Sequence, residues 1–272
     1  MRYIFILLSF LLATSFSFAS ESSKIRASSM VLINEPRLPD ANQFRTKLEE
    51  RIKGRVKIDS MEADGKSVIL LRVRGGTVMI GLIDRPIPKG QVDDLCQGAW
   101  YWSSACEDTS KHMGHIFVSV LDTNLDRLDT SLLLTDIIAV LMDSNAVASY
   151  WGASLQSREA FLKQSATASR SSPPVWLWMN FRISNDVKKG FSLSTQGMEE
   201  FDLREIEAKD VNRNGLEVFS LLLGTAQYLV AKGPVIKDGQ TIGHSPSLNI
   251  RVRQGPSYWR EGITVYRVIF PD

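Results

Sequence analysis

The sequence lacks several features that would point directly to a function. Its 32 Lys and Arg residues nearly balance its 30 Asp and Glu residues, which leaves a formal net charge of +2. This balance provides no overall attraction to nucleic acid, so we expect no nucleic-acid partner. The chain has no long run of like charges, no low-complexity tract and no Cys-x-x-Cys pair of the kind that ligates zinc. We therefore predict neither a metal site nor a cofactor.

Long apolar runs are also missing after the first nineteen residues, which have the parts of a secretory leader. Arg2 provides a positive start, residues 3–12 are mostly apolar, and the small residues Ser17 and Ala19 precede Ser20. These features are typical of a signal peptide that is cleaved after Ala19. A membrane-spanning helix needs about 20 predominantly apolar residues, and this run is shorter. We predict a periplasmic or secreted protein without a transmembrane segment after cleavage.

The mature chain is long enough for a well-packed core. Removing 19 of the 272 residues leaves 253, which suits one large domain. We predict a signal peptide over residues 1–19, a short linker over residues 20–29 and a single α+β domain over residues 30–272.

Cysteine occurs only twice, at Cys96 and Cys106. An exported protein meets an oxidising compartment, so two cysteines close in sequence are a disulfide candidate. If residues 93–106 formed one helix, about 15 Å would separate the two cysteines, whereas a disulfide requires α-carbons within about 7 Å. The bond therefore requires the helix to end before Cys106, near Ser103 or Ser104. The alternative is one buried thiol and one thiol in a loop.

Apolar periodicity and turn residues predict an alternation of strands and helices. Phe44, Leu48 and Ile52 recur every four residues between Asp40, a helix cap, and Gly54, a stop signal. Gly75-Gly76 predicts a tight hairpin between two strands. The predicted strands are residues 30–33, 56–61, 67–74, 77–83, 115–121, 147–151, 175–183, 191–195, 203–207, 250–253 and 263–270. The predicted helices are residues 41–53, 92–102, 130–142, 216–230 and a segment capped by Ser157.

These elements predict an α+β fold with mixed or antiparallel sheets and helices packed on them. Both halves follow the order strand, helix, three strands, helix, strand, so a duplication with its boundary near residue 145 is one hypothesis. The halves share no matching residues, and chance recurrence is the alternative. The two longest apolar helices supply the predicted core, namely Leu133, Ile137, Leu141, Leu222, Ala226 and Leu229.

Several short phrases occur together in a familiar order. They include Tyr150-Trp151-Gly152, Pro174-Val175-Trp176, Gly233-Pro234-Val235 and Asp238-Gly239-Gln240-Thr241-Ile242-Gly243. Over residues 30–272 the combination resembles the bacterial family called domain of unknown function 4261. That family has no established activity, so the resemblance implies a fold and no reaction. Its members usually begin near the equivalent of Met30, which favours an added export signal here.

Two segments contain residues that could carry chemistry. His244 and Ser245 adjoin, and Asp238 is close in sequence, which suggests a small envelope hydrolase. However, Ser247 replaces the final Gly of the Gly-x-Ser-x-Gly elbow, and an ordered loop is the alternative. His112 and His115 could suggest a metal, but the sequence offers no second ligand cluster. Histidines that are bonded to the backbone at a strand start are the preferred interpretation.

Binding is better supported by arginines and an aromatic residue near the C-terminus. Arg251 and Arg253 share one strand face if Ile250 and Val252 face the core, and Trp259 follows in a loop that Gly and Pro begin. We predict these three residues as part of a partner site, with a solvated sheet face as the alternative. The tryptophans at 100, 102, 151, 176 and 178 are expected in the core. The preferred function is non-enzymatic binding of an unknown protein or envelope component, for example an immunity-like role, with the His244-Ser245 hydrolase as the alternative.

Overall fold

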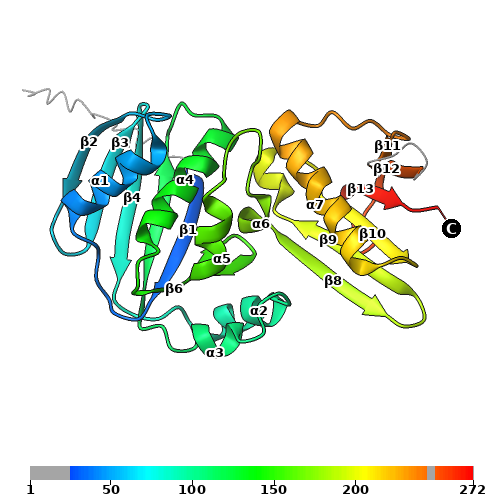
Figure 1. The fold of residues 1–272 in the computed structure, drawn as a ribbon, viewed down its shortest axis with the longest axis horizontal. Coiled ribbons are helices and arrows are strands. Elements are labelled where there is room, and N and C mark those ends of the chain that lie inside the picture. Colours follow the sequence, from blue (N-terminus) through cyan, green and yellow to red (C-terminus); the bar gives the residue numbers. More distant parts are fainter. Residues whose placement is uncertain (1–24, 244–248, 272) are drawn as a thin grey trace, which may run out of the picture.

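The computed structural model describes residues 25–243 and 249–271, and it confirms the α+β fold class (Figure 1). The predicted signal peptide and the His244-Ser245 pair lie outside the described residues. Two sheets lie side by side along the long axis, and helices pack on both of them.

Within the described residues, seven strands form the first sheet, in the order β2-β3-β4-β5-β1-β6-β7. Each neighbouring pair in this sheet is antiparallel. The strands are β1 (Ile25–Ile33), β2 (Ile58–Ala63), β3 (Val68–Val73), β4 (Gly76–Ile83), β5 (Gly114–Leu121), β6 (Ala146–Trp151) and β7 (Ser154–Ser157).

The second sheet has six described strands, in the order β11-β12-β13-β10-β9-β8. Its pairs are antiparallel except for the parallel pair β10 and β13. The strands are β8 (Asn180–Asp186), β9 (Gly190–Gln196), β10 (Ile206–Val211), β11 (Thr241–Ile242), β12 (Ile250–Pro256) and β13 (Thr264–Ile269).

The helices cover the sheets and join them. In Figure 1, α1 and α4 lie over the first sheet, α7 lies over the second, and α5 and α6 lie between the two. The described helices are α1 (Ala41–Ile52), α2 (Lys89–Gly98), α3 (Ala105–Thr109), α4 (Arg127–Leu141), α5 (Arg158–Ser165), α6 (Val175–Trp178), α7 (Gly215–Lys232) and the 3-10 helix η1 (Met198–Phe201). Among the residues that the structure describes, no helix has both the length and the apolar character that spanning a membrane requires.

Local signals explain where the main helices begin and end. The Asp40 carboxylate accepts a hydrogen bond from the Gln43 backbone N–H at 2.9 Å, and α1 ends at Lys53 in the left-handed conformation. The side chain of Asn214 caps α7 in the same way, and Gly233 at φ +83° ends it. These caps satisfy backbone groups that a helix end leaves without intrahelical partners.

The structure corrects two predicted elements. Residues 175–178 form the short helix α6 instead of the start of a strand, and β8 begins at Asn180. Pro173 and Pro174 explain the difference, because proline fixes φ near the helical value and is favoured at a helix start. The predicted helix over residues 92–102 is also shorter, since α2 ends at Gly98.

Sheet membership adds two further differences. Strand β1 begins at Ile25, within the predicted linker, because its pairing with β5 continues to that residue. Strand β6 pairs with β1, and β7 pairs with β6, so both belong to the first sheet. The change from one sheet to the other therefore falls between Ser157 and Asn180.

One hydrophobic core cluster contains buried residues of both sheets and of α4 and α7. All six residues predicted from the two long helices are buried, with exposed fractions of 3% or less. Trp151 and Trp178 are buried in this core, and the indole N–H of Trp178 donates to the Thr135 hydroxyl at 2.8 Å. Trp100 departs from the expected core position, because it is 43% exposed.

We expect Leu222→Ala in α7 to lower the free energy of unfolding by about 2–5 kcal/mol, because the side chain is fully buried and its loss leaves a cavity. Leu216→Ala in the same helix is the matched control. Leu216 is 72% exposed, so its truncation should change stability by no more than about 0.5 kcal/mol. Urea unfolding curves of the two variants test this, and equal midpoints would contradict the placement of α7.

Candidate functional site

Helix α7 covers only one face of the second sheet. Its buried residues Val218, Leu222 and Ala226 belong to the same core cluster as Leu193 of β9 and Val252 of β12. Because side chains alternate along a strand, the neighbours of those sheet residues point to the opposite face. That opposite face is the candidate site, and we call it the arginine face.

The register of the strands places polar side chains in one row across the arginine face. Arg253 of β12 pairs with Arg267 of β13, which pairs with Glu207 of β10. Glu207 in turn pairs with Ser194 of β9, which pairs with Arg182 of β8. Arg182 and Arg253 are exposed, whereas Arg267 is half-buried and Glu207 is buried. The row therefore places three guanidinium groups on one sheet surface.

Both arginines predicted on β12 are exposed and lie on this face. Arg251 lies opposite Ile269, and Arg253 forms an ion pair with Asp238 in which Nη1 and Oδ2 are 3.1 Å apart. Asp238 also accepts a hydrogen bond from the Gln254 backbone N–H at 2.7 Å. That bond first, and then Arg253, lowers the pKa of Asp238 below its usual value. Asp238 thus stays charged and holds the 237–240 turn against β12.

A buried carboxylate anchors the loop of residues 257–263 to the arginine face. Glu207 accepts hydrogen bonds from the Ser257 hydroxyl at 2.5 Å and from the Tyr258 backbone N–H at 2.7 Å. The Ser257 hydroxyl oxygen accepts in turn from the backbone N–H groups of Trp259 and Arg260. The backbone N–H of Ser257 donates to Ile263 O at 2.7 Å and closes the loop. These bonds give the loop a fixed base.

The anchored loop places Tyr258 against two cations. The Arg267 guanidinium carbon lies 4.2 Å from the centre of the Tyr258 ring, and the Lys209 ammonium lies 5.5 Å from it. Such contacts are attractive, because the face of an aromatic ring carries partial negative charge. The Nε atom of Arg267 and one terminal nitrogen of Arg260 are buried without a hydrogen-bond partner. No acceptor among the described residues thus satisfies these two guanidinium N–H groups.

Trp259 is 47% exposed and packs edge-on against Tyr258. The structure thus brings the loop beside Arg267 and Lys209, while Arg251 lies two pairs further along β12. Sequence reasoning missed Lys209, Tyr258 and Glu207 as members of the site. The parallel pairing of β10 with β13 brings them together, and residues about fifty positions apart show no local signal of such a pairing.

The histidines of the metal hypothesis are bonded to the backbone. Nε2 of His112 accepts from the Ile87 N–H at 2.8 Å, and Nδ1 of His112 lies 2.6 Å from Thr109 O. Nδ1 of His115 lies 3.0 Å from Arg85 O, and burial lowers the pKa of this imidazole. Among the residues in the described ranges, no group of three or more His, Cys, Asp and Glu side chains could hold a metal ion.

The hydrolase alternative depends on residues that lie outside the described ranges, His244 and Ser245. Its proposed acid, Asp238, is bonded to Arg253 and to the backbone of β12. A cavity of about 800 Å³ is lined by residues of α7 and of the segment 235–243. The hydrolase stays a prediction that no described contact tests.

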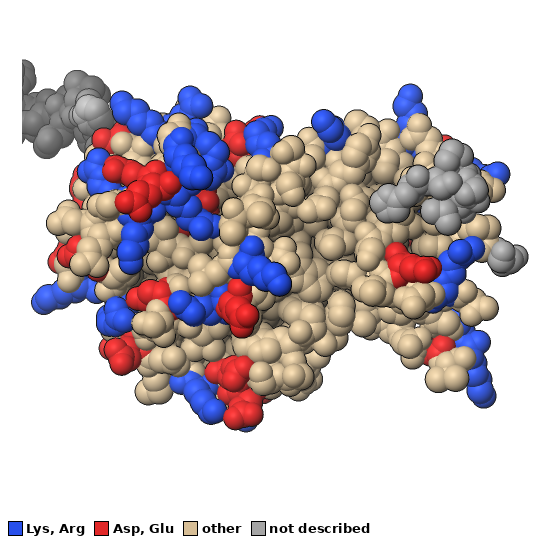
Figure 2. Space-filling model, viewed as in Figure 1, with Lys and Arg blue, Asp and Glu red and all other residues tan. Residues whose placement is uncertain are grey.

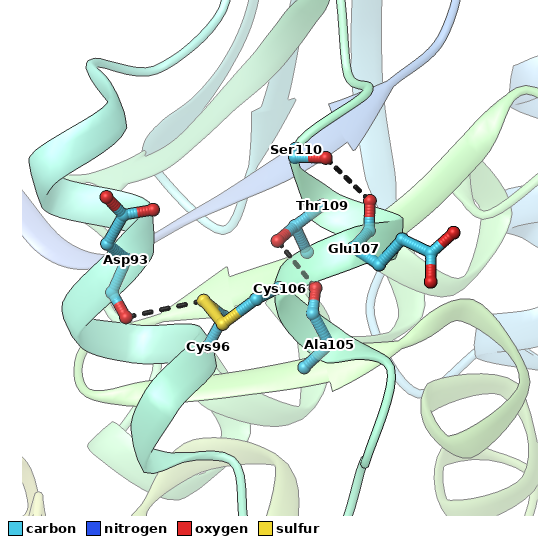
Figure 3. Close-up of a disulfide and its surroundings, with 7 residues drawn as sticks. All are labelled: Asp93, Cys96, Ala105, Cys106, Glu107, Thr109 and Ser110. Carbon is cyan, nitrogen blue, oxygen red and sulfur yellow. Dashed lines mark hydrogen bonds between the residues drawn. A yellow bond between two sulfur atoms is a disulfide. The ribbon is translucent and has the colours of Figure 1, made fainter.

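The structure confirms the disulfide between Cys96 and Cys106 (Figure 3). Helix α2 ends at Gly98 and α3 begins at Ala105, so the chain reverses and the two α-carbons lie 4.9 Å apart. Two side-chain bonds support α3, from Thr109 to Ala105 O and from Ser110 to Glu107 O. As the sequence argument required, the helix ends before Cys106, although it ends five residues earlier than Ser103.

The disulfide closes a loop that contacts both sheets. The indole N–H of Trp100 donates to Phe181 O of β8 at 2.9 Å, and the ring also packs against Phe219 of α7. The Tyr101 hydroxyl donates to Leu155 O of β7 at 2.7 Å, and burial raises the pKa of this phenol to about 12. The loop therefore joins the edge strand of the first sheet to the edge strand of the second.

We expect the double variant Cys96→Ser, Cys106→Ser to lose about 2–3 kcal/mol of unfolding free energy, because a closed loop restricts the unfolded chain. Urea unfolding with and without reductant measures this, and the reductant should affect only the parent protein. A thiol assay of the denatured parent should find no free thiol. Two free thiols in protein that was isolated without reductant would contradict the bond.

The similarity of this chain to a known family lies within the part that forms the second sheet. No curated protein and no solved structure matches the chain. The matched segment contains α7, β10, β12, β13 and the loop of residues 257–263, and so it includes Arg251, Arg253 and Trp259. This supports, for that part of the chain, the family resemblance found in the sequence: residues 194–269 match the family model described as Domain of unknown function (DUF4261).

Proposed function

We propose that this protein is an exported, non-enzymatic binding protein that recognises an anionic partner in the cell envelope through the arginine face. The observation that carries the proposal is the in-register row of Arg253, Arg267 and Arg182 on a sheet face that no described helix covers. Guanidinium groups are planar and present several donors, so they suit carboxylates and phosphates. The predicted signal peptide and the disulfide both fit an oxidising compartment.

The net charge of the arginine face favours the binding of an anionic partner. Its cations outnumber its carboxylates, and two of the carboxylates lie next to cations. The cations are Arg182, Lys209, Arg251, Arg253, Arg260 and Arg267, and the carboxylates are Asp186, Glu207, Asp210, Asp238 and Glu261. Asp238 is paired with Arg253, and an Asp210 oxygen lies 4.0 Å from the Lys209 ammonium. The excess positive charge therefore remains with the arginines.

The carboxylates of this face have structural partners, which favours binding over acid–base chemistry. Glu207 is fully buried and holds the loop base through Ser257 and Tyr258. Asp238 holds the turn before β11 through Arg253 and Gln254. A general acid or base needs a proton that it can exchange with a substrate. The hydrogen bonds of both groups instead hold loop and turn backbone in place.

Export is tested at the N-terminus of the protein that the producing cell makes. We expect N-terminal sequencing to begin near Ser20, because the small residues Ser17 and Ala19 suit signal cleavage at that point. The protein should be recovered from the envelope or medium fraction. Recovery of the chain from the cytoplasm with Met1 or Arg2 at its terminus would contradict the proposal.

Partner binding is tested with the double variant Arg251→Ala, Arg253→Ala. We expect its affinity for the captured envelope component to fall at least about tenfold. The variant removes two exposed charge-assisted contacts, each of which contributes about 1 kcal/mol or more. Its melting temperature should change little, since exposed ion pairs contribute little to stability. Capture by the parent protein should weaken as salt is added.

Lys188→Ala with Lys189→Ala is the matched control, because it removes two exposed cations from the β8–β9 hairpin of the same sheet. This control should capture the partner as well as the parent does. Equal loss in both variants would mean that only net charge matters, and unchanged capture by the folded arginine variant would move the site elsewhere.

A further inference from the structure

A cavity of about 420 Å³ lies beside the arginine face, where β10 and β13 end. Lys209 and Arg213 contribute cationic side chains to its lining, and Tyr258 and Ile269 contribute apolar surface. Asp210 is the only acidic residue of this lining within the described part of the chain. Its carboxylate lies 4.0 Å from the Lys209 ammonium, so the positive charge of Arg213 is the unbalanced charge of the cavity.

A bulge in β10 shapes this cavity. The pairing of β10 with β9 shifts between Ala208 and Val211, and Asp210 adopts φ +54°. The backbone N–H of Asp210 donates to the Ser192 hydroxyl at 3.0 Å, which holds the bulge in place. Arg213 donates to Pro271 O at 3.3 Å, and both residues line the cavity. The bulge and residues 268–271 thus form two walls of the cavity, which Tyr258 also lines.

Apolar side chains are exposed next to these cations. Trp259 is 47% exposed and Ile263 is 39% exposed in the anchored loop, and Ile269 on the neighbouring strand is 45% exposed. Single exposed apolar residues are common on protein surfaces, but here Trp259 packs on Tyr258, which lines the cavity together with Ile269. The fixed base of the loop, formed by Glu207 and Ser257, means that Trp259 is presented with little loss of conformational freedom on binding.

We propose that the loop of residues 257–263 and the adjoining cavity dock on an anionic membrane surface. Lys209 and Arg213 contact the phosphate of a lipid head group, and Trp259 and Ile263 enter the boundary between head groups and acyl chains. The proposal rests on the proposed function and names its anionic partner as a lipid surface.

The charge of this face and its exposed apolar side chains both favour an anionic membrane surface. The excess of cations on the arginine face is small, so electrostatic attraction alone would be weak, and buried apolar area must add to it. Tryptophan is the side chain that is enriched where a membrane meets water, because its ring is apolar and its N–H is polar. The face over α7 has the opposite character: Figure 2 shows few charged side chains there, and α7 itself contains only Glu217 and Lys232 as charged residues.

The experiment measures cosedimentation of the full mature protein with lipid vesicles. One vesicle type contains phosphatidylglycerol mixed with phosphatidylcholine, and the other contains phosphatidylcholine alone. We expect binding to the anionic vesicles at low salt, at least about tenfold weaker binding to the neutral ones, and a further decrease as salt is added. Brominated lipids should quench Trp259 fluorescence, and Trp259→Phe should lose most of that quenching.

Two variant pairs separate the two parts of the site. Lys209→Ala with Arg213→Ala removes the cavity cations, and Trp259→Ala with Ile263→Ala removes the apolar tip. Each should weaken binding to anionic vesicles at least about tenfold without a change in far-ultraviolet circular dichroism. Val187→Ala with Lys188→Ala is the matched control, because it removes one exposed apolar residue and one exposed cation from another hairpin of this sheet. This control should bind as the parent does.

Four results would overturn the proposal. The first is no binding to anionic vesicles, and the second is unchanged binding by the folded Trp259-Ile263 variant. The third is release of the protein from the vesicles by millimolar inorganic phosphate, together with binding of phosphate to the protein alone at the same concentration. That result would make the cavity a free-phosphate site. The fourth is capture of an acidic protein that depends on Arg251 and Arg253 without vesicle binding, in which case the proposed function stands and the lipid surface is wrong.

Discussion

The arrangement of the molecule depends on one constraint: a sheet buries a face only where other elements of the chain cover it. Helix α4 covers the first sheet and α7 covers the second, and their buried residues meet in one core cluster. The 44% hydrophobic content of the chain supplies these two layers, and the second sheet is covered by α7 on one side. The opposite face of the second sheet is therefore exposed and carries the arginines. The candidate site is a consequence of which sheet face α7 covers.

Buried carboxylates then fix the loops at the ends of β10. Glu205 accepts from the Thr195 hydroxyl at 2.6 Å and from the Gly197 and Met198 backbone N–H groups, which holds η1. Glu207 holds the loop of residues 257–263 in the same manner. A buried charge is costly unless hydrogen bonds satisfy it, and here each carboxylate accepts two or three. The cost of burying charge is offset by loops whose position is fixed, which is what a binding surface needs.

Periodicity in the sequence predicted the elements that a single stretch of chain can specify. The apolar stripe of α1 and the fully apolar character of α4 and α7 identified these helices and six of their core residues. Alternation of side chains along a strand likewise predicted that Arg251 and Arg253 share an exposed face. The prediction over residues 175–183 was wrong, because Pro173-Pro174 can precede either a helical turn or a strand. Packing of Trp178 in the core decided between the two.

The sequence by itself thus determined the α+β class, the long helices and the outward position of two arginines. These follow from side-chain patterns within about fifteen residues, where local hydrogen bonding and burial act alone. The sequence offered the Cys96–Cys106 disulfide as one of two alternatives, and the tertiary structure decided for it. Tertiary structure decided that β6 and β7 join the first sheet, that Lys209 and Arg267 lie against Tyr258, and that Glu207 anchors the loop. Those contacts depend on the pairing of distant strands, and pairing is chosen by the burial of whole sheet faces, which no short segment encodes.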